Sequence, residues 1–171
     1  LTLTGMMGVG KTTIGKSLAK KLKYNFVDID KIIEKKEGQS ISLIFKNKGE
    51  NYFRKIEKEI TLNELKKDKS VISLGGGAFL NNSIRQFSSK RSTSFWLDVP
   101  IETLLKRLKK SKNRPVLDTR KTNKSIKKIY FVRKKFYNRA DHRIKCRKKT
   151  VKQIINKILK IYEKSGNKIS K

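Results

Sequence analysis

The sequence predicts an α/β protein in which a parallel sheet lies between two layers of helices. Two observations indicate this fold: strand-like segments alternate with segments of helical periodicity, and a glycine-rich loop directly follows the first strand. Strand–helix–strand order makes the strands parallel, so ligands are expected at their carboxyl ends. The strand-like segments are residues 1–4, 25–28, 71–74, 93–98 and 143–146.

The first strand leads into a phosphate-binding loop. Residues 5–12 have the sequence GMMGVGKT, which fits the pattern G-x-x-x-x-G-K-T. Glycines let backbone N–H groups surround a polyphosphate. Apolar residues recur every four positions from Ile14 and predict a helix, whose dipole places its positive end at the bound phosphates. Lys11 would reach the β- and γ-phosphates, and the Thr12 hydroxyl would bind Mg²⁺; a plain glycine turn explains neither residue. The residues of this loop expected to bind ATP are Gly8, Val9, Gly10, Lys11, Thr12 and Thr13.

Length and composition indicate a single domain. The 171 residues suffice for one core, and the one cysteine, Cys146, excludes an internal disulfide and suits a reducing compartment. No stretch approaches the ~20 apolar residues of a membrane span, and the first residues lead into the phosphate loop rather than a signal-peptide cleavage site. We therefore expect a cytoplasmic monomer without a membrane partner.

The net charge of +31 raises nucleic-acid binding as an alternative, because a basic surface attracts any polyanion. However, lysines are spread over every segment, and the sequence has no RNA-binding signature and no zinc-ligand spacing. The aromatic neighbours Tyr130 and Phe131, and likewise Phe136 and Tyr137, fall at helical spacing that favours core packing. We expect no specific nucleic-acid partner.

Two regions interrupt the regular alternation. Residues 31–66 contain consecutive helical patterns between the second and third strands, and such an insertion usually forms an acceptor pocket. Residues 109–122 form a basic loop with one proline between two helices, as expected of a mobile lid. The rest of the domain is a core of residues 1–30, 67–108 and 123–164, followed by a frayed tail at 165–171.

Two carboxylates follow the second strand, in the sequence FVDID. Asp28 and Asp30 are two residues apart at the strand end, so both side chains are expected on one side of the sheet near the phosphate loop. There Asp28 would hold Mg²⁺, and Asp30 would orient or deprotonate an incoming hydroxyl. Alternatively, one of them only caps the helix that starts at Lys31.

Arg54 lies three residues before Glu57 and therefore on the same helical face, where the carboxylate would fix its guanidinium. An arginine held in this way is preorganised for a bidentate contact with a carboxylate ligand. A solvated arginine is the alternative, but the flanking Tyr52 and Phe53 favour a partly buried helix start.

Glycines Gly75, Gly76 and Gly77 follow the third strand directly. Three glycines after a buried strand let the backbone approach a ligand that side chains would displace, although a flexible turn is the alternative. Arg133, further along, would supply a second arm for an acidic substrate.

The lid loop contains Arg114, immediately before Pro115. This arginine would bind ATP and close over the phosphoryl group that is transferred. We therefore predict Arg114 as catalytic, together with Lys11 and Asp30. His142 is the only histidine and has no paired nucleophile, which favours a structural role.

Short motifs appear in a fixed order along residues 3–162. They are GMMGVGKTTIGK, FVDIDKIIE, GE-x-x-FR-x-x-E at 49–57, SLGGGA, the strand WLDV, RP-x-L in the lid, and R-x-x-x-Y-x-x-A-D at 133–141. This ordered set resembles the shikimate kinase family. The resemblance implies a P-loop NTPase-type three-layer α/β/α fold with a five-stranded parallel sheet, a helical substrate-binding insertion and a mobile lid. It also implies transfer of the γ-phosphoryl group of ATP, with Mg²⁺, to the 3-hydroxyl of shikimate in aromatic amino-acid biosynthesis.

At matching positions, the resemblance assigns Asp28 to the metal, Asp30 to the shikimate hydroxyls, and Arg54 and Arg133 to its carboxylate. Gly76 and Gly77 would contact its ring, and Gly75 is expected with them among the substrate-binding residues. A related kinase acting on another hydroxylated acid, such as gluconate, is the alternative within the enzymes, and the two arginines with the triple glycine favour shikimate.

The sequence departs from the family pattern at four places, the first being a lid between Lys110 and Arg114 that is shorter than in many members. Lys110 stands where an arginine often stacks on adenine, and Lys135 where proline is common. The adenine-side loop at 147–149 reads RKK and lacks its usual proline, and Lys149 in this loop is expected to bind ATP.

Overall fold

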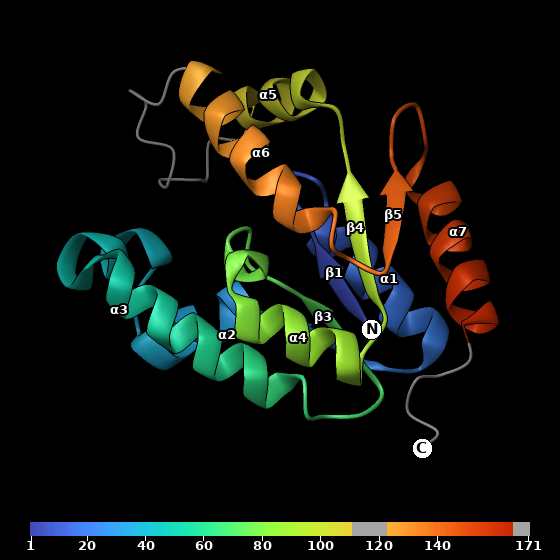
Figure 1. Ribbon diagram of the computed structural model, residues 1–171, viewed down its shortest axis with the longest axis horizontal. Helices are drawn as coiled ribbons and strands as arrows, with labels where there is room; N and C mark the ends of the chain where they lie inside the picture. Colours follow the sequence, from blue (N-terminus) through green and yellow to red (C-terminus); the bar gives the residue numbers. More distant parts are fainter. Residues whose placement is uncertain (111–122, 166–171) are drawn as a thin grey trace.

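The computed structural model describes residues 1–110 and 123–165 and contains a five-stranded parallel sheet with helices on both faces (Figure 1). The order across the sheet is β2-β3-β1-β4-β5, and every pair is parallel. The predicted three-layer α/β/α fold is therefore confirmed, and each predicted strand is present within one residue of its expected ends. The strands are β1 (Thr2–Thr4), β2 (Asn25–Asp28), β3 (Ser70–Ser73), β4 (Ser94–Asp98) and β5 (His142–Lys145).

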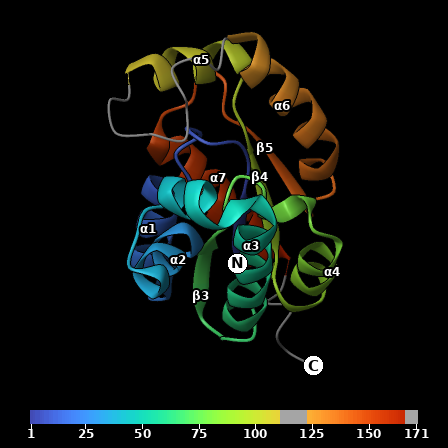
Figure 2. The ribbon, with the colours of Figure 1, turned by 90° about the vertical axis from the view of Figure 1, so that its left-hand side faces the viewer.

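Helices cover both faces of this sheet. Helices α1 and α7 lie on one face and α3 and α4 on the other, while α5 and much of α6 lie beyond the carboxyl ends of β4 and β5 (Figures 1 and 2). The helices are α1 (Lys11–Leu22), α2 (Ile29–Glu37), α3 (Ile41–Glu64), the 3₁₀ turn η1 (Ala78–Leu80), α4 (Asn82–Arg91), α5 (Ile101–Lys110), α6 (Asn123–Tyr137) and α7 (Val151–Lys164). None of the helices that the structure describes has the length and apolar character needed to cross a bilayer.

Local sequence signals start most of these helices. The side chains of Ser40, Asn81 and Thr150 accept hydrogen bonds from backbone N–H groups in the first turns of α3, α4 and α7, which satisfies donors that a helix leaves unpaired. Helix α1 differs, because its N-cap is Gly10 and no side chain caps it. The first turn of α1 therefore directly follows the glycine-rich loop, with no capping side chain between them.

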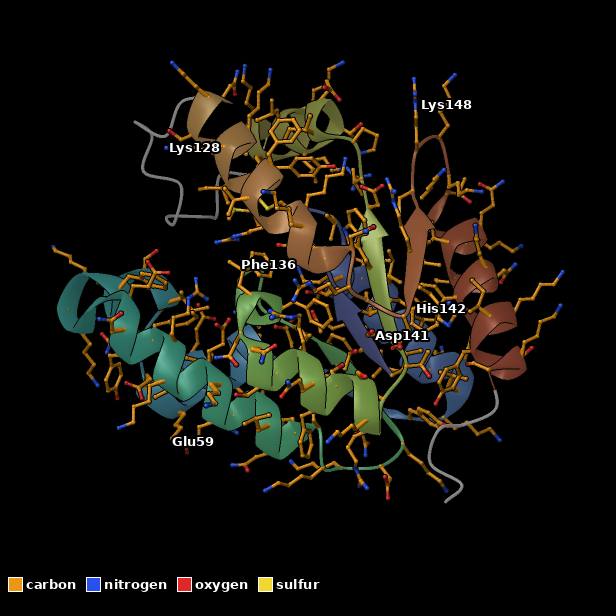
Figure 3. All side chains as sticks on the ribbon, in the orientation of Figure 1. Glu59, Lys128, Phe136, Asp141, His142 and Lys148 are labelled. Carbon is orange, nitrogen blue, oxygen red and sulfur yellow. The ribbon has the colours of Figure 1, made fainter. Side chains whose placement is uncertain are left out.

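The centre of the sheet is the most buried part of the molecule. All three residues of β1 are buried, and Phe95, Trp96 and Leu97 of β4 are at most 1% exposed. The carboxylate of Asp141, just before β5, accepts hydrogen bonds from the backbone N–H and the hydroxyl of Ser94, at 2.9 and 2.8 Å. The last residue of the motif at 133–141 thus ties the start of β5 to the start of β4 (Figure 3).

The aromatic neighbours on α6 are only half explained by core packing. Tyr130 and Tyr137 are buried as expected, at 7% and 0% exposure, but the expectation is wrong for Phe131, which is 56% exposed. Successive residues on a helix point about 100° apart, so only one of two neighbours can face the core.

His142 packs its ring against Phe95, with centroids 5.2 Å apart, in agreement with a structural role.

Candidate active site

The phosphate-binding loop lies between β1 and α1, at the carboxyl end of the central strand. Gly5, Gly8 and Gly10 have φ angles of 138°, 81° and 96°, a region that residues with a side chain rarely adopt. These conformations, with the uncapped start of α1, form the backbone cradle that the sequence pattern predicts. Lys11 bends over the loop, and its Nζ donates to the carbonyl oxygens of Gly5 and Met6 at 2.9 and 3.2 Å.

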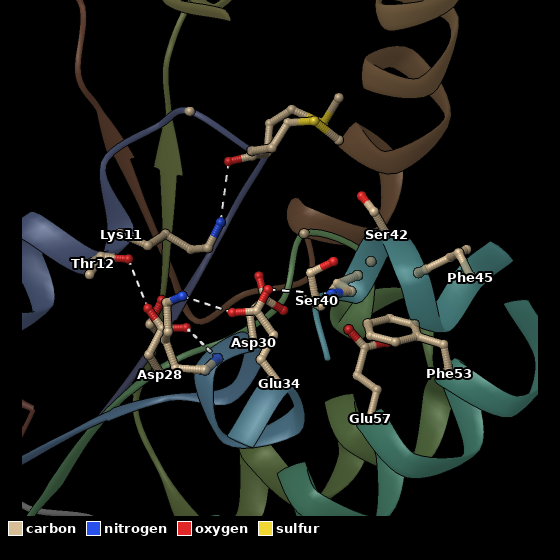
Figure 4. Close-up of a pocket in the computed structure, with 18 of the residues that line it drawn as sticks. Lys11, Thr12, Asp28, Asp30, Glu34, Ser40, Ser42, Phe45, Phe53 and Glu57 are labelled. Atoms are coloured by element: carbon tan, nitrogen blue, oxygen red, sulfur yellow. Dashed lines mark hydrogen bonds and ion pairs between the residues drawn. The ribbon is translucent and has the colours of Figure 1, made fainter. Parts of the chain in front are cut away.

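Beside the loop, two oxygen ligands of the kind that Mg²⁺ prefers lie together. The Thr12 hydroxyl donates to Oδ2 of Asp28 at 2.8 Å (Figure 4). The other carboxylate oxygen of Asp28 accepts from the N–H of Lys31 at 3.4 Å, so Asp28 also caps α2. The capping interpretation therefore applies to Asp28, while its second carboxylate oxygen lies beside Thr12, as the metal-binding interpretation requires.

The two carboxylates lie near each other, but the reason that the sequence suggested for this is wrong. Strand β2 ends at Asp28 and α2 begins at Ile29, so Asp30 lies in the first helical turn rather than on an extended strand. Alternation of side chains holds only while the chain is extended. Asp28 and Asp30 nevertheless line the same cavity.

Arg54 is fixed by carboxylates on both sides. Its Nη1 donates to Glu57 at 2.6 Å and its Nη2 to Glu50 at 3.0 Å, and the guanidinium lies over the ring of Phe53. The predicted pairing with Glu57 is thus present. Burial opposes the charge of Arg54, but the neighbouring carboxylates, chiefly Glu57, raise the pKa of Arg54 overall.

Glu57 is only 2% exposed, although it carries a carboxylate. Burial raises the pKa of Glu57, and the charge of Arg54 only partly offsets that effect. Within the described part of the chain, Oε1 of Glu57 is buried without a hydrogen-bond partner. A buried acceptor of this kind calls for a donor from a ligand or a water molecule.

The triple glycine after β3 accommodates charged side chains of the protein. A Cβ atom on Gly75 would lie 2.4 Å from Oε1 of Glu57, and one on Gly77 would lie 2.5 Å from Nη1 of Arg54. A Cβ atom on Gly76 would lie 3.3 Å from Nη1 of Arg133. The glycines therefore leave room for charged side chains of the protein itself. From the sequence alone, that room was expected to serve a ligand.

Arg133 approaches this turn from α6. Its Nη1 donates to the carbonyl oxygen of Gly76 at 3.1 Å. Three segments that are separate in the sequence, α3, the glycine turn and α6, thus meet at one point.

Most of these groups surround one cavity of about 730 Å³. In Figure 4, Lys11, Thr12 and Asp28 lie on one side of it, and Phe45, Phe53 and Glu57 on the other. Its walls include, from the predicted site, Gly8, Gly10, Lys11, Thr12, Thr13, Asp28, Asp30, Arg54, Gly76, Gly77 and Arg133. A phosphate loop and two arginines around one space can hold a polyphosphate facing a small organic acid.

Other predicted residues lie away from this cavity. Val9 is buried, Gly75 lies behind Glu57 and Asp30, and Lys149 is exposed in the turn after β5, where its N–H donates to Cys146. The predicted roles of Arg114 and of the Lys110 side chain fall outside what the structure describes.

Arg107 on α5 was missed by the sequence interpretation. Its Nη1 donates to the carbonyl oxygens of Gly8 and Val9 at 3.3 and 3.5 Å, so the helix leading to residue 110 contacts the phosphate loop. The available signal was composition, because Arg107 is the one arginine in a helix whose other basic residues are lysines.

Comparison with known proteins gives a consistent result. Residues 7–163 match the family model described as shikimate kinase. The shikimate kinase of Persephonella marina is 45% identical over 157 residues, which cover 92% of this chain and 94% of that protein. The structure of shikimate kinase from Acinetobacter baumannii in complex with shikimate has a TM-score of 0.90 at 31% identity, covering 96% of this chain and 93% of that one. For the shikimate kinase structure from Aquifex aeolicus the TM-score is 0.84 at 36% identity, covering 97% and 98%.

Proposed function

The chain belongs to the shikimate kinase family, and we propose that its site transfers the γ-phosphoryl group of ATP to the 3-hydroxyl of shikimate. Phosphorylation of shikimate is a step of aromatic amino-acid biosynthesis. The observation that supports this reaction most strongly is the shared cavity, in which the phosphate loop faces Arg54, Arg133 and Asp30. Phosphoryl transfer depends mainly on positioning and charge stabilisation, which this arrangement provides.

The phosphate loop and Lys11 bind ATP in this proposal. Backbone N–H groups of Gly8 to Thr13 surround the phosphates, and Lys11 exchanges its contacts with the Gly5 and Met6 carbonyls for phosphate oxygens. Because the lysine already lies over the loop, the exchange requires a small movement of a flexible side chain.

Thr12 and Asp28 fit a magnesium site. No group of three or more acidic, histidine or cysteine side chains suited to a metal occurs in the described residues, but Mg²⁺ commonly takes one or two protein oxygens and completes its shell with phosphate and water. The hydroxyl of Thr12 and the carboxylate of Asp28, 2.8 Å apart, supply oxygens of that kind. When bound, Mg²⁺ would neutralise charge on the phosphate oxygens.

The acid is held on the opposite side of the cavity. Arg54 and Arg133 bind its carboxylate, and the pairing of Arg54 with Glu50 and Glu57 keeps that guanidinium oriented. Asp30 lies between the acid and the phosphate loop, where it orients the 3-hydroxyl and accepts its proton. Gly76 and Gly77 let the ring approach the turn after β3.

Segments around the cavity complete the proposal. Residues 31–66 form the acid pocket, and residues 109–122 with Arg114 act as a lid that excludes water, so that ATP is not hydrolysed. Lys149 contacts the adenine side of ATP. One chain provides both the phosphate loop and the acid pocket, which supports a monomeric protein in a single domain, acting on small molecules in the cytoplasm.

A coupled ADP-release assay with shikimate, quinate and gluconate tests the function. We expect ADP release that depends on shikimate, with kcat/KM at least about tenfold above that for the other two acids. The matched control is Lys11→Met, which should lower kcat by about 100-fold or more while thermal unfolding stays unchanged. Equal rates with gluconate, or near-normal turnover of Lys11→Met, contradict the proposal. Salt-sensitive RNA binding without shikimate-dependent ADP release would favour the nucleic-acid alternative.

A further inference from the structure

Tyr137, the last residue of α6, is fully buried, although it carries a polar hydroxyl. Its ring lies against that of Trp96 in the centre of β4, with centroids 6.1 Å apart. A ring packed in this way has little freedom to move, so its hydroxyl is held at a defined position.

The hydroxyl of Tyr137 lies between the two loops of the active site. It donates to the carbonyl oxygen of Gly76 and lies 3.9 Å from the sulfur of Met6, in the phosphate loop. These loops abut there, because a Cβ atom on Gly76 would lie 3.6 Å from the backbone nitrogen of Met7. Burial raises the pKa of Tyr137 to about 12, so the hydroxyl stays protonated and donates at neutral pH.

The Gly76 carbonyl accepts a second hydrogen bond, from Nη1 of Arg133 at 3.1 Å. Arg133 precedes Tyr137 by one helical turn, so both donors approach the same oxygen from one face of α6. A carbonyl oxygen has two lone pairs, and these two donors use both. The direction of the Arg133 guanidinium therefore depends on where Tyr137 holds this carbonyl.

Arg133 differs from Arg54 in its partners. Arg54 is paired with two carboxylates, whereas Arg133 has no carboxylate within ion-pair distance among the residues that the structure describes. Its orientation accordingly relies on the neutral Gly76 carbonyl, while its remaining N–H groups stay available to the cavity that it lines.

We infer that Tyr137 is a positioning residue for the acid site: its hydroxyl holds the Gly76 carbonyl, which in turn aims Arg133 at the carboxylate of shikimate. This inference rests on the proposed function, in which Arg133 contacts that carboxylate. Tyr137 does not touch the substrate and acts only through Gly76 and Arg133.

The test is Tyr137→Phe, which removes the hydroxyl and keeps the ring. One neutral hydrogen bond typically contributes about 1 kcal/mol, so KM and Kd for shikimate should rise about fivefold. Both kcat and KM for ATP should stay within about twofold of wild type, because the phosphate loop keeps its own contacts. Isothermal titration calorimetry of the wild type and the variant measures Kd for shikimate directly.

The matched control is Tyr130→Phe on the same helix. Tyr130 is also buried, and its hydroxyl donates to Asp98 at 3.4 Å, away from the glycine turn. This variant should leave KM for shikimate unchanged. Thermal unfolding of both variants shows that each retains its fold.

A double-mutant cycle separates positioning from general packing. Arg133→Ala should raise KM for shikimate strongly, and adding Tyr137→Phe to it should raise KM by less than about twofold further. The same rise caused by Tyr137→Phe in both backgrounds overturns the inference. The inference is also overturned if KM for shikimate of Tyr137→Phe stays within twofold of wild type while that of Arg133→Ala rises. In that case the proposed function still stands. If Arg133→Ala leaves KM unchanged, the assignment of Arg133 fails, and the inference fails with it.

Discussion

Each glycine after β3 is explained by a different charged neighbour. Gly75 lies under Glu57 and Asp30, and Gly77 lies under the guanidinium of Arg54. Gly77 has a φ of −106°, which any residue adopts, so backbone strain does not require a glycine there. Space is the constraint, and the side chain that needs the space is Arg54, which we propose as a ligand of the acid.

Gly77→Ala should therefore impair substrate binding without destabilising the protein. The added methyl group would lie 2.5 to 2.7 Å from the end of the Arg54 side chain, which is flexible and would move away. We expect KM for shikimate to rise by about tenfold or more, with a melting temperature within about 2 °C of wild type.

The companion variants for this prediction are Gly76→Ala and Arg54→Lys. A methyl group on Gly76 would lie 3.3 Å from Arg133, so that variant should have a smaller effect than Gly77→Ala. Arg54→Lys should raise KM strongly by itself, since an ammonium group cannot reproduce the fork, and combining it with Gly77→Ala should add little. Unaltered shikimate kinetics in Gly77→Ala would show that the Arg54 guanidinium keeps its position despite the added methyl group.

Among the elements, α3 forms one wall of the cavity on both sides of a bend. Gly49 interrupts the helix with φ 79° and ψ 171°. The cavity is lined by Ser40, Ile41, Ser42 and Phe45 before this bend, and by Glu50, Phe53, Arg54 and Glu57 after it. The bend thus allows both parts of α3 to contribute to one wall.

Gly49→Asn should destabilise the protein, because the backbone conformation of Gly49 is essentially restricted to glycine, at a cost of about 1–3 kcal/mol for other residues. The matched control is Gly38→Asn at the end of α2, where φ 64° and ψ 13° define the left-handed region that asparagine tolerates. Neither position has a heavy atom within 4 Å of an added Cβ, so only the backbone term differs.

For Gly49→Asn we expect the melting temperature to fall by about 3–8 °C and KM for shikimate to rise, because residues before the bend would shift. Gly38→Asn should stay near wild type in both measurements. Equal stability of the two variants would mean that the bend is not set by Gly49.

At the scale of the whole molecule, positive charge dominates the surface. The chain carries 45 basic and 14 acidic residues, and side chains such as Lys128 and Lys148 extend away from the ribbon (Figure 3). Seven ion pairs occur among the described residues, so most lysines there are not neutralised by a close carboxylate. Repulsion between such charges destabilises the compact state and is screened by salt.

The melting temperature should accordingly rise by several degrees between about 20 and 300 mM NaCl. The double variant Lys152→Glu, Lys157→Glu, on the exposed side of α7, lowers the net charge and should give a smaller rise. A salt response that is identical in both proteins would exclude charge repulsion as its cause. In the same series, kcat/KM for the anionic substrate should fall as salt increases, because electrostatic steering weakens.

The sequence allowed accurate prediction of the features that depend on local pattern. The phosphate loop, the five strands and the pairing of Arg54 with Glu57 follow from residue spacing, because backbone conformation and contacts within one helical turn are local properties. Asp28 and Asp30 were placed in the right cavity for a reason that fails at the first residue of α2.

By itself, the sequence determined the fold class, the order of the site motifs and the chemistry of their side chains. Only the tertiary structure decided which of these side chains meet. Arg107 on the phosphate loop, Tyr137 and Arg133 on one carbonyl of Gly76, and the charged groups above the three glycines all join distant parts of the chain. Such contacts depend on how helices pack against the sheet, and spacing along the chain carries no record of that packing.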